Sequence, residues 1–196
     1  MKEMRRWKFP RVAASVMLVF GCLGGCSAFR GDDHDRANVK QAVKRIDSVL
    51  DDTFKAIRPR IKWREGPAHI SAHRNSFTNT ANGEVGVGRK RYVRTKVSKL
   101  KLTELIKAVY KHWWAAGYEI GEMNTRRPTF SATAADGCVI NFSVGGYGNI
   151  SVSASVDVSS DAVSGDIWGE EGDKFPKAPN GGPDYAPDVR DPYWSK

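Results

Sequence analysis

The sequence contains few cysteines and lacks a long hydrophobic run, and both absences narrow the class of protein. The chain has 196 residues and three cysteines, Cys22, Cys26 and Cys138. If the residues before Cys26 are removed and Cys26 is acylated, one thiol remains, so a hydrophobic core must hold the domain together. The apolar stretch from Val12 to Leu23 would span about 18 Å as a helix, which is too short for the ~30 Å hydrocarbon core of a bilayer.

Recognisable catalytic and cofactor motifs are also missing. His69 and His73 lie in a segment with strand character, where four residues span about 13 Å, so they cannot share one metal ion. The glycine-rich stretches 83–88 and 145–148 do not open a helix, as a phosphate-binding loop requires. Cys138 has no nearby charged residue to activate its thiol. We therefore predict no metal site and no cofactor, and the sequence identifies no catalytic residue.

The N-terminal segment has the pattern of an export signal. Five basic residues precede the apolar stretch, which then ends in Leu23-Gly24-Gly25-Cys26. A basic start followed by a short apolar segment is typical of a signal peptide and favours export of the rest of the chain. The four terminal residues resemble the lipobox of bacterial lipoproteins. An ordinary signal peptide or an uncleaved anchor, with Cys26 incidental, is the alternative.

The lipobox resemblance implies that Cys26 carries a diacylglyceryl group and that the chain is cut just before it. Two acyl chains anchor a protein stably, whereas one gives only marginal binding. We therefore expect a palmitate-type lipid on Cys26 and a location at the cell membrane, on its extracytoplasmic face. Nucleic acid is not an expected partner there.

Composition divides the exported chain into three parts. Residues 26–34 form a short polar spacer, and residues 35–158 carry the periodic patterns of a globular domain. Residues 159–196 are acidic and rich in glycine and proline, without a sustained period, and predict a largely disordered tail. The end of this tail, Asp191-Pro192-Tyr193-Trp194, is unusually aromatic, and it either docks on the domain or stays free.

Two helices and a series of strands are predicted within residues 35–158. Apolar residues at steps of three and four predict helices over 35–57 and 103–116. Extended segments are predicted at 60–74, interrupted by Gly66-Pro67, and at 84–96, 118–123, 129–134, 138–144 and 150–156. Residues 150–156 alternate between apolar and serine, which is typical of an antiparallel sheet with one wet face. The predicted fold is α+β: a two-layer sandwich with two helices on one face, in the order α-β-β-α-β-β-β(-β).

Over residues 35–156 the chain resembles small uncharacterised lipoproteins of actinomycetes. The resemblance rests on His112-Trp113 and Gly117-Tyr118 near the second helix, on the turn Asp136-Gly137, and on the run from Val144 to Asn149. These motifs are mostly structural. The resemblance implies a fold and a location, and it implies no catalytic residue.

One basic strand is the best candidate for a binding site. It contains Arg89, Lys90, Arg91, Tyr92, Arg94 and Lys96. Alternation along a strand places Lys90, Tyr92, Arg94 and Lys96 on one face, which could hold an anionic envelope polymer or an acidic protein. The alternative is a solvated edge strand, or a face neutralised by the protein's own acidic tail.

These observations favour a membrane-tethered, non-catalytic lipoprotein that contacts an envelope component or a partner protein. An envelope enzyme of hydrolase type, with a site assembled from scattered residues, is the main alternative, because active sites are spatial and not sequential. A purely structural accessory subunit is a third possibility. The partner's identity and the oligomeric state do not follow from the sequence.

Overall fold

The computed structural model describes residues 31–162 and 164–196, which form one compact unit from Gly31 to Lys196. The predicted signal peptide, the lipobox and Cys26 lie outside the described residues. In chain order the elements are α1 (Gly31–Ala56), β1 (Trp63–Glu65), β2 (His69–Arg74), β3 (Ala81–Val93), α2 (Lys99–Ala115), β4 (Glu119–Ile120), β5 (Thr129–Thr133), β6 (Val139–Val144), β7 (Ile150–Ser159) and β8 (Gly165–Asp166).

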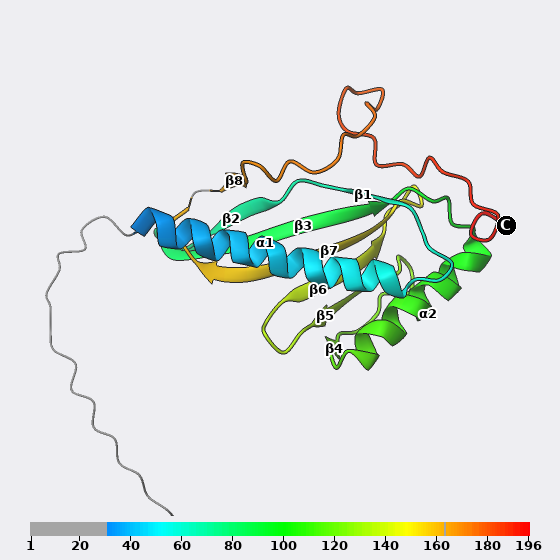
Figure 1. Cartoon of the computed structure of the whole chain (residues 1–196), viewed down its shortest axis with the longest axis horizontal. Coiled ribbons are helices and arrows are strands. Elements are labelled where there is room, and N and C mark those ends of the chain that lie inside the picture. The colour runs from blue at the N-terminus through cyan, green and yellow to red at the C-terminus, as the bar shows by residue number, and fades with distance from the viewer. Residues whose placement is uncertain (1–30, 163) are drawn as a thin grey trace, which may run out of the picture. The chain divides into compact units, whose positions relative to one another are not determined.

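Within the described residues the strands make one antiparallel sheet of eight strands. Seven of them follow the order β4-β5-β6-β7-β3-β2-β8, and the eighth, β1, pairs with β3. The long strand β3 pairs on one side with β7 and on the other with β2 and then β1. Figure 1 shows α1 lying across one face of this sheet. The structure confirms the predicted α+β class, an antiparallel sheet with two helices. The extended segment predicted at 60–74 forms the two strands β1 and β2, and the short strand β8 is additional.

The helices pack on the sheet face that carries the apolar side chains of alternate strand residues. Phe130 of β5, Phe142 of β6 and Val152 of β7 are each 1% exposed on this face. Trp113 of α2 contacts the Phe130 ring at 5.0 Å between centroids, and its indole N–H donates to Thr53 of α1 over 3.0 Å. The core therefore lies between one sheet face and both helices.

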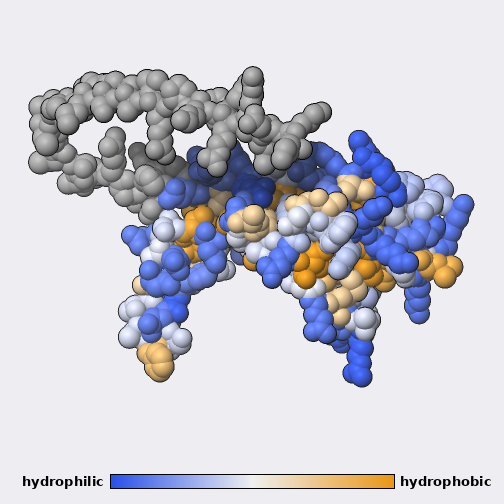
Figure 2. Space-filling model, turned by 90° about the horizontal axis from the view of Figure 1, so that it is seen from below, coloured by the Kyte–Doolittle hydropathy of each residue, from blue (hydrophilic) through white to orange (hydrophobic). Residues whose placement is uncertain are grey.

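The opposite sheet face is polar, as the serine alternation of β7 predicted. Three of its residues, Ser131, Asn141 and Ser153, lie at directly paired positions of β5, β6 and β7. All three side chains are partly exposed. Figure 2 views the molecule from below, across the edge of the sheet, and there hydrophilic residues cover most of the coloured surface, with apolar areas between them.

Local signals explain both boundaries of α2. Ser98 caps α2, because its hydroxyl accepts from the Lys101 N–H at 3.3 Å, so the helix starts before the predicted residue Thr103. Gly117 ends α2 in the left-handed region at φ +76°, and the following N–H of Tyr118 donates to the Trp113 carbonyl at 3.0 Å. This arrangement satisfies carbonyls at the helix end, as expected for a glycine at this position.

The C-terminal segment, residues 159–196, corrects the expected domain boundary. Its Trp194 side chain is 1% exposed, and the indole N–H donates to the Pro59 carbonyl at 3.0 Å. The Ser98 N–H donates to the Trp194 carbonyl at 2.9 Å, which ties the chain end to the start of α2. The segment therefore belongs to the globular unit, because aromatic residues and backbone hydrogen bonds compensate for its low content of aliphatic residues.

No helix in the described part of the chain is both long and apolar enough to cross a bilayer.

Candidate functional site

Strand β3 divides the predicted basic cluster between the two faces of the sheet. Arg89 and Arg91 point toward the helices and are each 3% exposed. Lys90 and Tyr92 point to the opposite face, and the Lys90 side chain is exposed. Arg94 and Lys96 follow the strand and lie beside the C-terminal segment. The six residues therefore do not make one surface.

The two buried arginines form an ion-pair cluster with carboxylates from three elements. We call it the arginine–carboxylate cluster; its members are Arg89, Arg91, Asp47, Asp51, Glu65 and Glu170. Arg89 Nη1 donates to Asp47 Oδ2 at 2.8 Å and to Glu65 Oε1 at 3.1 Å, and its Nη2 donates to Glu170. Arg91 Nη1 donates to Asp51 Oδ1 at 2.7 Å. Both guanidinium groups are thus neutralised from within the chain.

The electrostatics of Arg89 follow from this arrangement. Burial alone lowers the pKa of the guanidinium, but the hydrogen bond to Glu170 and the charges of Asp47 and Glu65 outweigh burial and raise its pKa. Arg89 stays charged under all physiological conditions. We interpret the cluster as a structural clamp that joins α1, β1 and the C-terminal segment to β3.

On the opposite face the C-terminal segment covers part of the predicted anion-binding surface. The Tyr92 ring stacks on Tyr185 at 4.2 Å between centroids and meets Phe175 edge-on at 5.4 Å. Burial and the neighbouring Tyr185 raise the pKa of Tyr92 to about 12. Arg94 makes a bidentate pair with Asp188, with two N–O distances of 2.9 Å. The C-terminal segment therefore neutralises Arg94 and covers Tyr92 on this face.

Lys90 and Lys96 retain exposed side chains. The backbone N–H of Lys96 donates to the Val189 carbonyl at 2.7 Å, so only its side chain is available to solvent.

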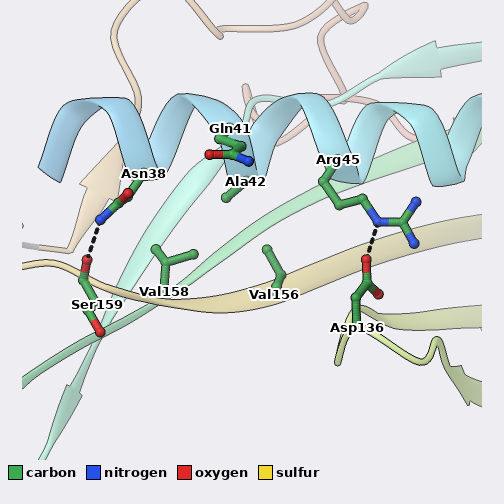
Figure 3. Close-up of a pocket in the computed structure, with 8 residues that line it drawn as sticks. All are labelled: Asn38, Gln41, Ala42, Arg45, Asp136, Val156, Val158 and Ser159. Atoms are coloured by element: carbon green, nitrogen blue, oxygen red, sulfur yellow. Dashed lines mark hydrogen bonds and ion pairs between the residues drawn. The ribbon is translucent and has the colours of Figure 1, made fainter. Parts of the chain in front are cut away.

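An open groove lies between α1 and β7. We call it the α1–β7 groove. Its volume is about 450 Å³, and it is lined by Asn38, Gln41, Ala42, Arg45, Asp136, Val156, Val158 and Ser159. Figure 3 shows the two valines pointing from β7 toward the helix. The volume falls within the usual range for ligand pockets.

Strand lengths create this groove. The pairing of β7 with β6 ends at Ser155, opposite Val139, whereas the pairing of β7 with β3 continues to Ser159. Beyond Ser155, β7 therefore has no paired strand on its β6 side among the described residues. Val156 and Val158 lie on this overhang with partly exposed side chains beneath α1.

Two polar contacts hold the ends of the α1–β7 groove (Figure 3). Asn38 Nδ2 donates to the Ser159 carbonyl at 3.3 Å, and Arg45 Nε donates to Asp136 Oδ2 at 2.5 Å. The hydrogen bond from Arg45 lowers the pKa of Asp136, and the same bond raises the pKa of Arg45. Both groups are therefore charged at neutral pH, and their ion pair joins α1 to the turn before β6 at one end of the groove.

Comparison with known proteins gave no match. No family model, curated protein or solved structure is detectably similar to this chain.

The structure also shows the surroundings of His73 and Cys138, two other residues considered from the sequence. His73 Nε2 lies 3.3 Å from Asp157 Oδ1. Cys138 is buried, and burial raises the pKa of its thiol, which opposes formation of a nucleophilic thiolate. In the described residues no three histidine, cysteine or acidic side chains are grouped as a metal would require.

Sequence reasoning missed the groove because its two walls lie far apart in the sequence, with α1 ending at Ala56 and β7 beginning at Ile150. One signal was present: the alternation of β7 continues through Asp157, Val158 and Ser159, beyond the predicted end at residue 156. A strand that is longer than its neighbour leaves an unpaired edge. The sequence of β7 does not show where its pairing with β6 stops.

Proposed function

We propose that this chain is a lipoprotein, tethered by lipid on Cys26 to the extracytoplasmic face of the cell membrane, that binds a partner protein in the α1–β7 groove. The observation that carries this proposal is the overhang of β7 beneath α1. It offers a strand edge that no described strand pairs beyond Ser155, with the Ser159 carbonyl taken by Asn38, and two valines that face the helix.

The chemistry of the groove favours an extended segment of another protein. Val156 and Val158 are two residues apart on a strand, about 7 Å, which matches alternate side chains of a second extended chain. An exposed strand edge supplies backbone hydrogen bonds to such a segment, and pockets for alternate side chains supply specificity. We therefore expect a partner segment with small apolar residues at alternate positions.

The groove proposal is tested by site-specific photocrosslinking in the cells that make the protein. A benzoylphenylalanine at Gln41, which lines the groove, should give a discrete protein adduct. The same residue at Lys40, exposed on α1 but outside the groove lining, should not. The Gln41 adduct should disappear when Val158→Asp is added, in a protein whose circular dichroism is unchanged. Equal adducts at both positions, or none at Gln41, would contradict the proposed groove.

The anchor is tested separately. Cys26→Ala should move the protein from the membrane fraction to the soluble fraction, whereas Cys138→Ala, at a buried position, should leave it in the membrane. Mass spectrometry should find a diacylglyceryl group on an N-terminal Cys26. An unmodified sulfur, or an intact leader, excludes the anchor.

A further inference from the structure

The hairpin between β2 and β3 presents an isolated aromatic residue at its tip. Phe77 is 98% exposed, although a phenylalanine side chain gains free energy when it leaves water. The backbone beneath it is well held. Asn75 Oδ1 accepts from the N–H groups of Phe77 and Thr78 at 2.9 and 3.2 Å, and the Asn75 N–H donates to the Thr80 carbonyl at 2.9 Å. The hairpin thus projects Phe77 from a defined turn.

This hairpin and the start of α1 lie at the same end of the sheet. Asn38 in α1 bonds to the carbonyl of Ser159, and Ser159 pairs with Glu84 at the beginning of β3. Farther along, Asp47 and Asp51 of α1 pair with Arg89 and Arg91, so α1 runs in the same direction as β3. In Figure 1 the beginnings of α1 and β3 lie toward the same side.

The chain length before α1 limits how far this end can be from a lipid on Cys26. Helix α1 begins at Gly31, and an extended segment from Cys26 to Gly31 spans at most about 18 Å. From Asn38 back to Gly31 the helix rises about 10 Å toward the side on which the β2–β3 hairpin projects. A lipid on Cys26 therefore keeps this end of the domain next to the bilayer.

The composition of the hairpin tip suits the headgroup region of a membrane. Residues 75–83 contain no aspartate or glutamate, the first acidic residue of β3 being Glu84, and Arg74 stands at the base of the turn. Arg74 Nη1 donates to the Asn79 carbonyl at 2.9 Å, which places a positive charge close to the tip. Amphipathic and aromatic residues beside basic ones are favoured at membrane interfaces.

We propose that the β2–β3 hairpin is a second membrane contact, in which Phe77 enters the lipid headgroup region and orients the domain on the bilayer. This inference rests on the proposed function, because it requires the lipid on Cys26. The contact would leave the opposite end of the sheet, with the β6–β7 hairpin, directed away from the membrane. That hairpin carries Tyr147, which is 101% exposed and provides a matched control.

The test uses the lipidated protein purified from membranes and incorporated into vesicles of phosphatidylethanolamine and phosphatidylglycerol. Phe77→Cys and Tyr147→Cys variants are each labelled with an NBD fluorophore, while Cys138 remains buried and unlabelled. With spin-labelled lipids in the vesicles, the probe at residue 77 should lose most of its fluorescence and shift to shorter wavelength. The probe at residue 147 should keep its fluorescence.

The outcomes separate the hairpin contact from the anchor. Protein that floats with the vesicles but shows no quenching at residue 77 overturns the hairpin contact and leaves the anchor standing; a protein partner for Phe77 would then be indicated. Equal quenching at residues 77 and 147 contradicts the proposed orientation of the domain on the bilayer. Protein that does not float contradicts both proposals.

Discussion

Arg89 carries its charge into a site where 3% of the side chain is exposed, and three carboxylates from separate parts of the chain meet there. Without the guanidinium, Asp47, Glu65 and Glu170 would repel one another in a partly desolvated site. The carboxylate side chains are 22–35% exposed, so water can relieve part of this repulsion. Removal of Arg89 should therefore lower the free energy of unfolding more than removal of any one of the three carboxylates.

We predict that Arg89→Met lowers the free energy of unfolding by about 3 kcal/mol, because Asp47 and Glu170 lose their guanidinium partner in a partly desolvated site, whereas Glu65 keeps Arg91. Arg94→Met is the matched control. Its ion pair with Asp188 is more exposed, and such pairs contribute about 0–1 kcal/mol. Urea unfolding of both variants measures the difference, and similar losses for the two would show that the cluster is not a clamp.

Asp188 makes part of the fold sensitive to acid. The hydrogen bonds from Arg94 lower the pKa of the Asp188 carboxyl, with a further contribution from the charge of Arg64. A carboxyl whose folded pKa is lowered stabilises the fold above its ordinary pKa of about 4, and this contribution is lost as the pH falls through the folded pKa. The attachment of the C-terminal segment near Arg94 should therefore weaken only in acid.

The prediction is that Asp188→Asn is less stable than the wild type at pH 7 and that the difference disappears at low pH. Urea midpoints measured from pH 7 down to pH values below the ordinary aspartate pKa test this. A constant difference between the two proteins over the whole range would contradict the assigned charge effect.

At the scale of elements, the sequence predicted periodic patterns well. The apolar stripe of α1 and the alternation of β7 identify the buried face without a structure, because both patterns repeat many times. The face of β3 was harder to assign, since buried arginines oppose the usual rule that charges face water. One signal existed: Asp47 and Asp51 are one helical turn apart, about 6 Å, and Arg89 and Arg91 are about 7 Å apart on a strand. These matched spacings point to a helix–strand ion-pair ladder.

The C-terminal segment could not be predicted by periodicity, because its attachment depends on single residues. Trp194 is buried, whereas Trp168 in the same segment is 95% exposed. Both sit in regions rich in proline, glycine and aspartate, so local composition does not distinguish them. Their different environments follow from contacts with Pro59 and Ser98, which lie far away in the sequence.

We predict that Trp194→Ala lowers the free energy of unfolding by about 3–5 kcal/mol, as expected when a large aromatic side chain is removed from a core. Trp168→Ala should change it by about 0.5 kcal/mol or less, since exposed substitutions are usually neutral. Thermal or urea unfolding of the two variants provides the comparison. If Trp194→Ala is as mild as Trp168→Ala, the chain end is not part of the core.

At the scale of the whole molecule, the unit from Gly31 to Lys196 depends on residues 159–196 for contacts on both sheet faces. Glu170 joins the arginine–carboxylate cluster on the helix side, and Tyr185 covers Tyr92 on the other side. Trp194 then seals the junction between the end of α1 and the start of α2. A domain ending at the boundary predicted from composition, Val158, would lack all three contacts.

A chain ending at Val158 should therefore unfold at a lower urea concentration and with a smaller m-value, because less surface is buried in its folded state. A chain ending at Ser195 is the control. It retains Trp194 and the hydrogen bond from the Ser195 hydroxyl to the Lys96 carbonyl, and it loses only the exposed Lys196. In the full chain, fluorescence and circular dichroism should report one shared transition, since the segment and the sheet unfold together. Two separated transitions in the full chain, or an unchanged midpoint after truncation at Val158, would show that the segment is only an appendage.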